Sequence, residues 1–195
     1  MIMSYAILQP PFTLKFREMT KKELKAYFDW FLSQVPSRIG ELERAVKEED
    51  SLVAWSADKS PESLATLGDW FAQKVETRRR TADEITELSA ASSFPIVIPD
   101  HELTNRTFSL AMDVGMYFAE CLQVQCPRLE WQQPLNDPKF IDYGQPVLIG
   151  FGPVPLNPVR ILINLAYGIA DKKQDGGRLR ALYDYWSKQA GNAKR

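Results

Sequence analysis

The longest helical pattern in the chain, from about Thr104 to Gln125, constrains the fold more than any other feature. Apolar side chains recur there every three or four residues, and this spacing places them on one face of a helix. That wide face comprises Leu110, Ala111, Val114, Tyr117, Phe118, Cys121 and Leu122. Pro127 ends the pattern, because proline cannot continue a helix. Such a helix needs other elements to cover its apolar face.

The segment PVLIGF, from Pro146 to Phe151, predicts a strand that is buried on both faces. Its GFG continuation looks like the start of a phosphate-binding loop, but Pro153 and Pro155 follow it, and proline lacks the amide donors of such a loop. We therefore predict a strand, a stiff turn and a helix capped by Asn157. One central core is expected to contain Leu110, Val114, Phe118, Val147, Ile149 and Leu162.

Shorter patterns predict the remaining elements. A capping box at Thr20 and Glu23 begins a helix that runs to about Pro36, where we expect a bend into a second helix. Further helices are expected at 60–75, 81–90 and 178–186, and extended pieces at 12–16, 51–55 and 129–133. The predicted fold class is α+β, mostly helical, with a small, mainly antiparallel sheet in the C-terminal half. We expect a single domain over residues 1–195, with a sub-boundary near 92–100, where prolines interrupt the pattern.

Charge and hydropathy exclude several classes of partner. The net charge of −1 argues against a general nucleic-acid binder, which usually carries a basic surface. The single basic run, Arg78 to Arg80, is interpreted as a solvated helix end. The apolar run from Val159 to Ala170 is too short to span a bilayer. The first residues lack the basic region of a signal peptide, so we expect a cytoplasmic protein with no membrane partner.

Neither a metal nor another cofactor is predicted. The chain has two cysteines, Cys121 and Cys126, and a single histidine, His101, which cannot complete a Cys/His zinc set. Cys121 lies on the apolar helix face, where a thiol behaves as a small inert hydrophobic group. We therefore predict that the protein binds no transition metal tightly.

A few polar residues are candidates for chemistry. Asp113 and Glu120 share a helix face, and together with Asp142 or His101 they could serve as acid, base or metal ligands. The alternative, which we favour, is a charged edge in contact with solvent. Separately, Arg160, Asn164 and Asp171 form a polar stripe on an apolar helix. Asp142 is a plausible internal partner for Arg160, so this stripe has a structural interpretation as well as a functional one.

Several segments resemble a family of bacterial proteins of unknown function. The resemblance rests on SPESLATLGDWF, FSLAMDVGMYFAECL with the tryptophan strand after it, IDYGQPVLIGF, LNPVRILINLAYG and LYDYW. It covers most of the chain and implies no activity and no catalytic residues. Proteins of this type are similar to the immunity proteins and antitoxin-like neighbours of bacterial toxins, although no residue match supports that analogy.

The first hypothesis for function is a non-enzymatic cytoplasmic bacterial protein that acts by protein–protein contact and neutralises a toxin domain. One alternative is a small-molecule or metal-dependent enzyme that uses the clustered carboxylates. Another is a structural or oligomeric module, and a homo-oligomer is left open. The turn from Tyr143 to Arg160 is the expected contact region, because its prolines limit the entropy lost on binding. The predicted partner-binding residues are Tyr143, Phe151, Arg160 and Asn164.

Overall fold

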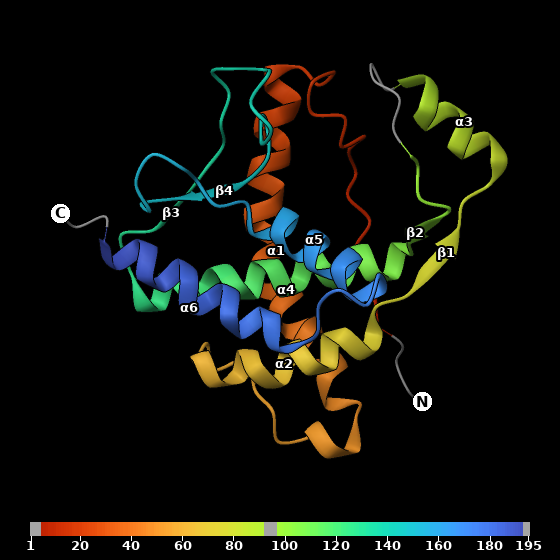
Figure 1. Ribbon diagram of the computed structural model, residues 1–195. Coiled ribbons are helices and arrows are strands. Elements are labelled where there is room, and N and C mark those ends of the chain that lie inside the picture. Colours follow the sequence, from red (N-terminus) through yellow and green to blue (C-terminus); the bar gives the residue numbers. More distant parts are fainter. Residues whose placement is uncertain (1–4, 92–96, 193–195) are drawn as a thin grey trace.

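A computed structural model describes residues 5–91 and 97–192, and it shows a mostly helical α+β domain (Figure 1). Its strands form two separate two-stranded antiparallel sheets, β1–β2 and β3–β4. The predicted fold class is therefore confirmed. The elements are α1 (Lys21–Lys47), a 3-10 turn (Asp50–Leu52), α2 (Pro61–Lys74), β1 (Thr77–Arg79), α3 (Ala82–Ala91), β2 (His101–Leu103), α4 (Asn105–Gln125), β3 (Glu130–Gln132), β4 (Val147–Ile149), α5 (Pro158–Ala170) and α6 (Gly177–Asn192).

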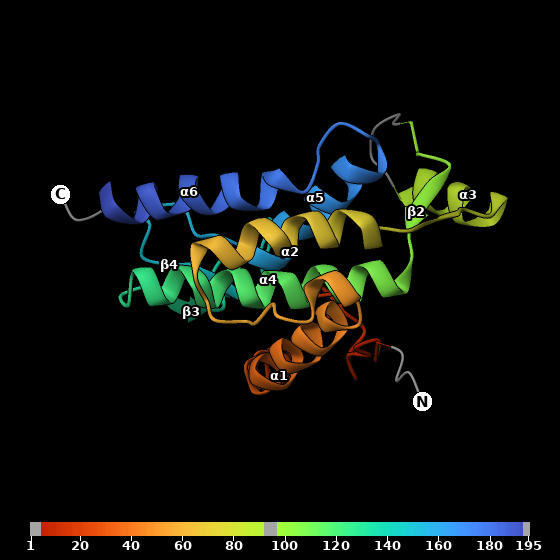
Figure 2. The ribbon, with the colours of Figure 1, turned by 90° about the horizontal axis from the view of Figure 1, so that it is seen from below.

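Helix α4 lies at the centre of the molecule, as its wide apolar face predicts. It contacts α1, α2, α5 and α6, and α2 also packs against α6. Figure 2 shows α2, α4 and α6 side by side, with α1 running across α4 on the outer side. The side chain of Thr104 caps α4 by accepting a hydrogen bond from the amide of Thr107 at 3.2 Å. The predicted helix from Thr104 to Gln125 is thus confirmed.

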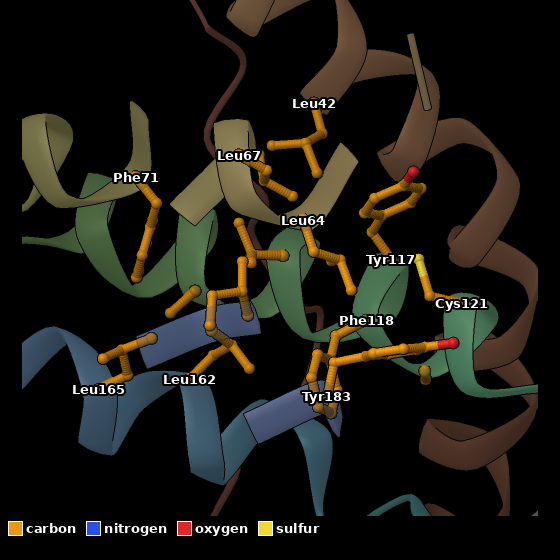
Figure 3. Packing of buried hydrophobic residues seen from close by; sticks show 14 of the residues in the cluster. Leu42, Leu64, Leu67, Phe71, Tyr117, Phe118, Cys121, Leu162, Leu165 and Tyr183 are labelled. Carbon is orange, nitrogen blue, oxygen red and sulfur yellow. The ribbon is translucent and has the colours of Figure 1, made fainter. Parts of the chain in front are cut away.

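The main core lies between α2, α4, α5 and α6 (Figure 3). Phe118 of α4 is fully buried there, and its ring meets that of Tyr183 edge-on at 6.5 Å. Of the predicted core residues, Leu110, Val114, Phe118 and Leu162 belong to this cluster, and Val147 is buried. The prediction that Ile149 belongs to the core is wrong, because Ile149 is only half-buried. Its neighbour Leu148 lies on the other face of the short strand and packs into the cluster instead.

Helix α1 continues through Pro36, so the predicted bend into a second helix is wrong. The predicted capping box is present at its start, where Glu23 accepts a 2.7 Å hydrogen bond from the amide of Thr20. Pro36 lies on the exposed face, while Val35 and Arg38 on either side of it are buried. Because both halves of the helix are held by burial on the same side, the missing amide donor of proline does not end the helix.

The interpretation of the basic run from Arg78 to Arg80 as a helix end is also wrong, because Arg78 and Arg79 lie in strand β1. Arg78 lies in β1 opposite Glu102 of β2, and it also forms a 2.7 Å ion pair with Glu84. Two expected extended pieces are also absent. Residues 12–16 are irregular, and residues 50–52 form a 3-10 turn in place of an extended piece. The predicted sub-boundary near 92–100 lies in part outside the described residues, which exclude 92–96.

The strand, turn and helix predicted after residue 146 are all present. β4 pairs with β3, and Leu148 makes an additional bridge to Leu156. Gly150 and Gly152 both have φ of 109°, a backbone conformation that side chains other than glycine rarely adopt. Asn157 then caps α5 by accepting a 2.9 Å hydrogen bond from the amide of Arg160.

Candidate protein-contact surface

Three adjoining hollows surround the irregular segment that precedes α1, which is red in Figure 1. The first, of about 480 Å³, lies between this segment and α4. The second, of about 320 Å³, lies between residues 14–18 and residues 141–145. The third, of about 420 Å³, lies between residues 10–13 and the start of α1. Leu14 lines both the first and the second hollow, and Pro10 lines both the first and the third, so the hollows form one continuous surface.

The lining of this surface is largely apolar. In the first hollow it includes Ile7, Leu8, Pro10, Leu14, Phe108 and Met112. Large apolar side chains also remain accessible, with exposed fractions of 41% for Ile7, 37% for Leu14 and 59% for Ile141. Scattered single exposures are normal, but a group of them around connected hollows is typical of contact surfaces.

The backbone of Leu14 is strained. Its φ of 57° lies in the left-handed region, where the β-carbon of a leucine is unfavourable and glycine or asparagine is the usual residue. This conformation also explains why the alternating pattern of residues 12–16 forms no strand. It turns the segment between the first and the second hollow, so the strained residue lies where the two hollows meet.

A buried polar network lies beneath the first hollow. The guanidinium of Arg38 in α1 donates two hydrogen bonds to the carboxylate of Asp113 in α4, through Nε to Oδ1 at 2.8 Å and through Nη2 to Oδ2 at 2.7 Å. The hydroxyl of Tyr5 donates to Oδ2 of Asp113 at 2.5 Å and accepts from Nη2 of Arg38 at 2.8 Å. Ser109 lies 2.7 Å from the same hydroxyl and also lines the hollow. The network thus fixes the segment, α1 and α4 to one another.

Burial dominates the electrostatics of this network. It raises the pKa of Asp113 to about 6, against the hydrogen bonds and the charge of Arg38, which lower that pKa. It also raises the pKa of the Tyr5 phenol, and the nearby Asp113 charge adds to this effect. The phenol therefore stays protonated and keeps its hydrogen for Asp113.

Two backbone amides complete the attachment of the segment. The amide of Ala6 donates to Oε1 of Glu41 in α1 at 2.6 Å, and the amide of Leu8 donates to Oγ of Ser109 in α4 at 2.8 Å. One wall of the first hollow is therefore held by hydrogen bonds to two different helices. We infer that the hollow is preformed rather than created by a ligand.

The four predicted partner-binding residues differ in their exposure. Tyr143 is half-buried and lines the second hollow. Asn164 is exposed on α5, and Arg160 is half-buried one turn before it. Phe151 is only 7% exposed, and its ring packs against Trp186 with centroids 5.0 Å apart. Phe151 is therefore a core side chain and not an anchor on the surface.

The sequence-based pairing of Arg160 with Asp142 is present. Nη2 of Arg160 donates to Oδ2 of Asp142 at 2.8 Å, and Asn157 donates to Oδ1 of the same carboxylate at 2.8 Å. Asn157 also donates to the side chain of Gln145 at 3.0 Å, and Gln145 lines the second hollow. These bonds fix the turn that carries Tyr143 against the start of α5.

The residues considered for catalysis each bind a different partner. Asp113 is fully buried and binds Arg38 in the network described above, so the expected charged edge in contact with solvent is wrong at this residue. Glu120 forms a 2.6 Å ion pair with Lys59, and His101 lies 3.1 Å from Asp171 on a separate part of the surface. Within residues 5–91 and 97–192, no three His, Cys, Asp or Glu side chains are grouped in a way that could hold a metal ion. The structure therefore does not bring these candidates into one site.

Sequence reasoning missed Tyr5, Arg38 and Ser109, which form the buried network with Asp113, and of which Ser109 lines the first hollow. One signal was available, because Arg38 occupies a position in the buried stripe of α1 between Val35 and Leu42. A cation at such a position needs a buried partner. Nothing local in the sequence identifies that partner as Asp113, which lies 75 residues further along the chain.

Among the described residues, no helix has both the length and the apolar character that crossing a membrane requires. Comparison of the chain with protein-family models, with curated proteins and with solved structures gives no significant match.

Proposed function

We propose that the protein acts by binding another protein through the surface that the three hollows form together with Tyr143 and Arg160. The observation that carries the proposal is the first hollow, which is apolar, accessible and built over a fully hydrogen-bonded floor. A surface that is already ordered loses little conformational entropy on association. Its aromatic and arginine neighbours belong to the residue types that contribute most to binding energy at interfaces.

The partner class that we propose to test first is a bacterial toxin domain. The protein would then work in the cytoplasm by covering the toxin, with no chemical step of its own. The choice follows the analogy of type with the immunity proteins of bacterial toxins, which no residue match supports. Contact alone is sufficient for neutralisation, so this function needs no convergent set of catalytic side chains.

The test is a binding measurement with matched surface variants. Tagged full-length protein is used to capture partners, and each captured protein is then purified and titrated calorimetrically against the wild type, Ile7→Asp and Val124→Asp. Val124 is 61% exposed on the same helix that lines the first hollow, but it lies twelve residues beyond Met112, about 18 Å along the helix axis. We expect Ile7→Asp to weaken binding by roughly tenfold or more, a change of about 1.4 kcal/mol, and Val124→Asp to leave it unchanged.

Equal affinity of all three proteins for a reconstituted partner would place the contact elsewhere and reject this surface. If the captured partner is a toxin that the protein neutralises, cells that express it should grow only when the wild-type protein is co-expressed. A partner that does not impair growth by itself would reject neutralisation while leaving the contact function intact.

A further inference from the structure

The segment that lines the second hollow and leads into α1 is locally basic, although the chain as a whole is slightly acidic. Residues 15–25 hold five cations, Lys15, Arg17, Lys21, Lys22 and Lys25, and two carboxylates, Glu18 and Glu23, whereas the full sequence has a net charge of −1. All five cations are exposed. Their concentration in one short segment therefore gives this part of the surface a positive potential.

The carboxylates of the chain neutralise only part of this charge. Lys15 lies 3.5 Å from Glu18 and Lys25 lies 3.3 Å from Asp29, both as exposed pairs. Glu23 is engaged in the capping box, and its hydrogen bonds from Thr20 lower the pKa of Glu23.

Three cations remain without such a partner. Among the described residues, no carboxylate forms an ion pair with Arg17, Lys21 or Lys22. The Arg17 side chain donates a hydrogen bond to the backbone carbonyl of Pro138, at 2.9 Å. These cations are available to an external anion.

Helix stability does not explain these cations. Lys21 and Lys22 occupy the first turn of α1, where the backbone dipole favours carboxylates and disfavours positive charge. A sequence optimised only for folding would place acidic residues there. Residues that are unfavourable for the local structure they occupy are expected at functional sites.

The strained backbone lies beside the same charges. Leu14, with its φ of 57°, immediately precedes Lys15 and separates the first hollow from the second. Unfavourable backbone conformations concentrate at ligand-binding positions. Cations opposed to a helix dipole, a strained leucine and a hollow of mixed apolar and charged lining therefore lie within about a dozen residues.

We propose that the partner presents an acidic protein segment, with carboxylates that approach Arg17, Lys21 and Lys22 and an apolar side chain that packs against the apolar part of the second hollow, formed by Leu14, Phe16 and Ile141. This inference rests on the proposed contact function and specifies the chemistry of the partner. A hollow that has both apolar side chains and cations in its lining selects for that combination, because the cations orient the acidic segment and the apolar side chains cover its apolar residue.

The experiment selects peptides from a random displayed library on the immobilised full-length protein. Enriched peptides are synthesised and titrated against the wild type, the triple variant Arg17→Glu/Lys21→Glu/Lys22→Glu and the control Lys188→Glu, which reverses an exposed charge on α6. We expect the enriched peptides to combine Asp or Glu with an apolar residue, and their affinity to fall with added salt. The triple variant should weaken binding by roughly tenfold or more, and Lys188→Glu should not.

Thermal unfolding of the same proteins separates a lost site from a lost fold. Because glutamates suit the first turn of a helix, the triple variant is expected to melt at the same temperature as the wild type or above it. Weaker binding by a protein that is equally or more stable supports the proposal. If the triple variant is unfolded, the binding measurement is repeated with Arg17→Glu alone, because Arg17 lies outside the helix.

Several results would overturn the inference. Enriched peptides that are neutral or basic, or acidic peptides that bind the triple variant as tightly as the wild type, exclude an acidic partner at these cations. If those peptides still lose affinity in Ile7→Asp, the contact function survives and only the partner chemistry fails. If no peptide is enriched, the result counts against both the contact function and the acidic partner. Binding of a 24-base-pair DNA duplex that competes with the peptides would assign the charge to nucleic acid instead.

Discussion

Arg38 and Asp113 form the most consequential pair of residues in the described chain. Their side chains are 9% and 0% exposed, so both charges are removed from water. Removing charges from water costs free energy, and the raised pKa of Asp113 shows that its burial outweighs the attraction of Arg38. The pair therefore fixes the relative positions of α1, α4 and Tyr5. It is not a large source of stability.

Substitution of one partner is expected to be far more damaging than substitution of both. Arg38→Met leaves the Asp113 carboxylate buried without its cation, and we expect a loss of roughly 3–5 kcal/mol in the free energy of unfolding. The double variant Arg38→Met/Asp113→Leu removes both charges and should recover most of that loss. Urea unfolding monitored by circular dichroism measures both. A double variant less stable than the single one would show that the pair itself stabilises the fold.

The raised pKa of Asp113 also predicts a dependence of stability on pH. The folded-state pKa of about 6 lies above the ordinary value near 4, so between these values the folded protein holds a proton that the unfolded chain has released. The stabilising contribution of this group is complete below about pH 4 and is lost as the pH rises through about 6. Asp113→Asn cannot titrate and should lack this part of the pH profile. If the free energy of unfolding depends on pH in the same way for the two proteins between pH 4 and 7, the raised pKa does not belong to Asp113.

At the scale of elements, two glycines show how closely the helices pack. A β-carbon on Gly68 in α2 would overlap the carbonyl oxygen of Gly176, just before α6. A β-carbon on Gly115 in α4 would lie 3.1 Å from the backbone of Pro158 and Val159 at the start of α5. Since both close approaches are to backbone atoms, a side chain at either position forces an element to move.

Gly68→Ala and Gly40→Ala are a matched pair for testing this packing. Gly40 lies in α1 with no atom within 4 Å of an added β-carbon. There we expect alanine to stabilise the helix by roughly 0.5–1 kcal/mol, because it restricts the unfolded chain. At Gly68 the same change should destabilise the protein by roughly 1–3 kcal/mol through overpacking. Opposite shifts in melting temperature confirm the model of the α2–α6 contact, and a stabilising Gly68→Ala would refute it.

The elements also show where sequence reasoning succeeds. Helix α4 could be predicted from its apolar spacing, and helix α5 together with its cap Asn157, because apolar spacing and capping residues are local signals. The continuation of α1 through Pro36 could not, since it depends on burial of Val35 and Arg38 against distant elements.

Strand β1 was missed for a related reason. Its arginines form a strand because β2 supplies the partner Glu102, 24 residues after Arg78. The same limit applies to the candidate surface. Tyr143 lines the second hollow, and its role as a contact residue stays a prediction. The bond from Tyr5 to Asp113 spans 108 residues and has no local signal.

At the scale of the whole molecule, one cluster unites elements from both sides of residues 92–100. It contains buried residues of α1, α2, α4, α5 and α6. Because none of these five helices can move away without exposing part of this cluster, we expect a single cooperative unfolding transition. Calorimetry should then give equal calorimetric and van't Hoff enthalpies. Two resolved transitions would instead support a boundary near residues 92–100.

Helix α3 should be the exception to that cooperativity. None of its residues is buried, and it projects from one end of the molecule together with β1 and β2 (Figure 1). Local opening of such an element exposes little apolar surface, so its free energy is small.

The contact between α2 and α6 has a consequence for biosynthesis. Translation produces α2 early and α6 late, with α4 between them, so the apolar side chains of α2, such as Leu67 and Phe71, emerge before the helices that cover them. A nascent chain that has made only α1 and α2 carries an unshielded apolar face and is exposed to aggregation. Premature stop codons before residue 177 would leave this face open permanently, and such fragments are natural clients for chaperones and proteases.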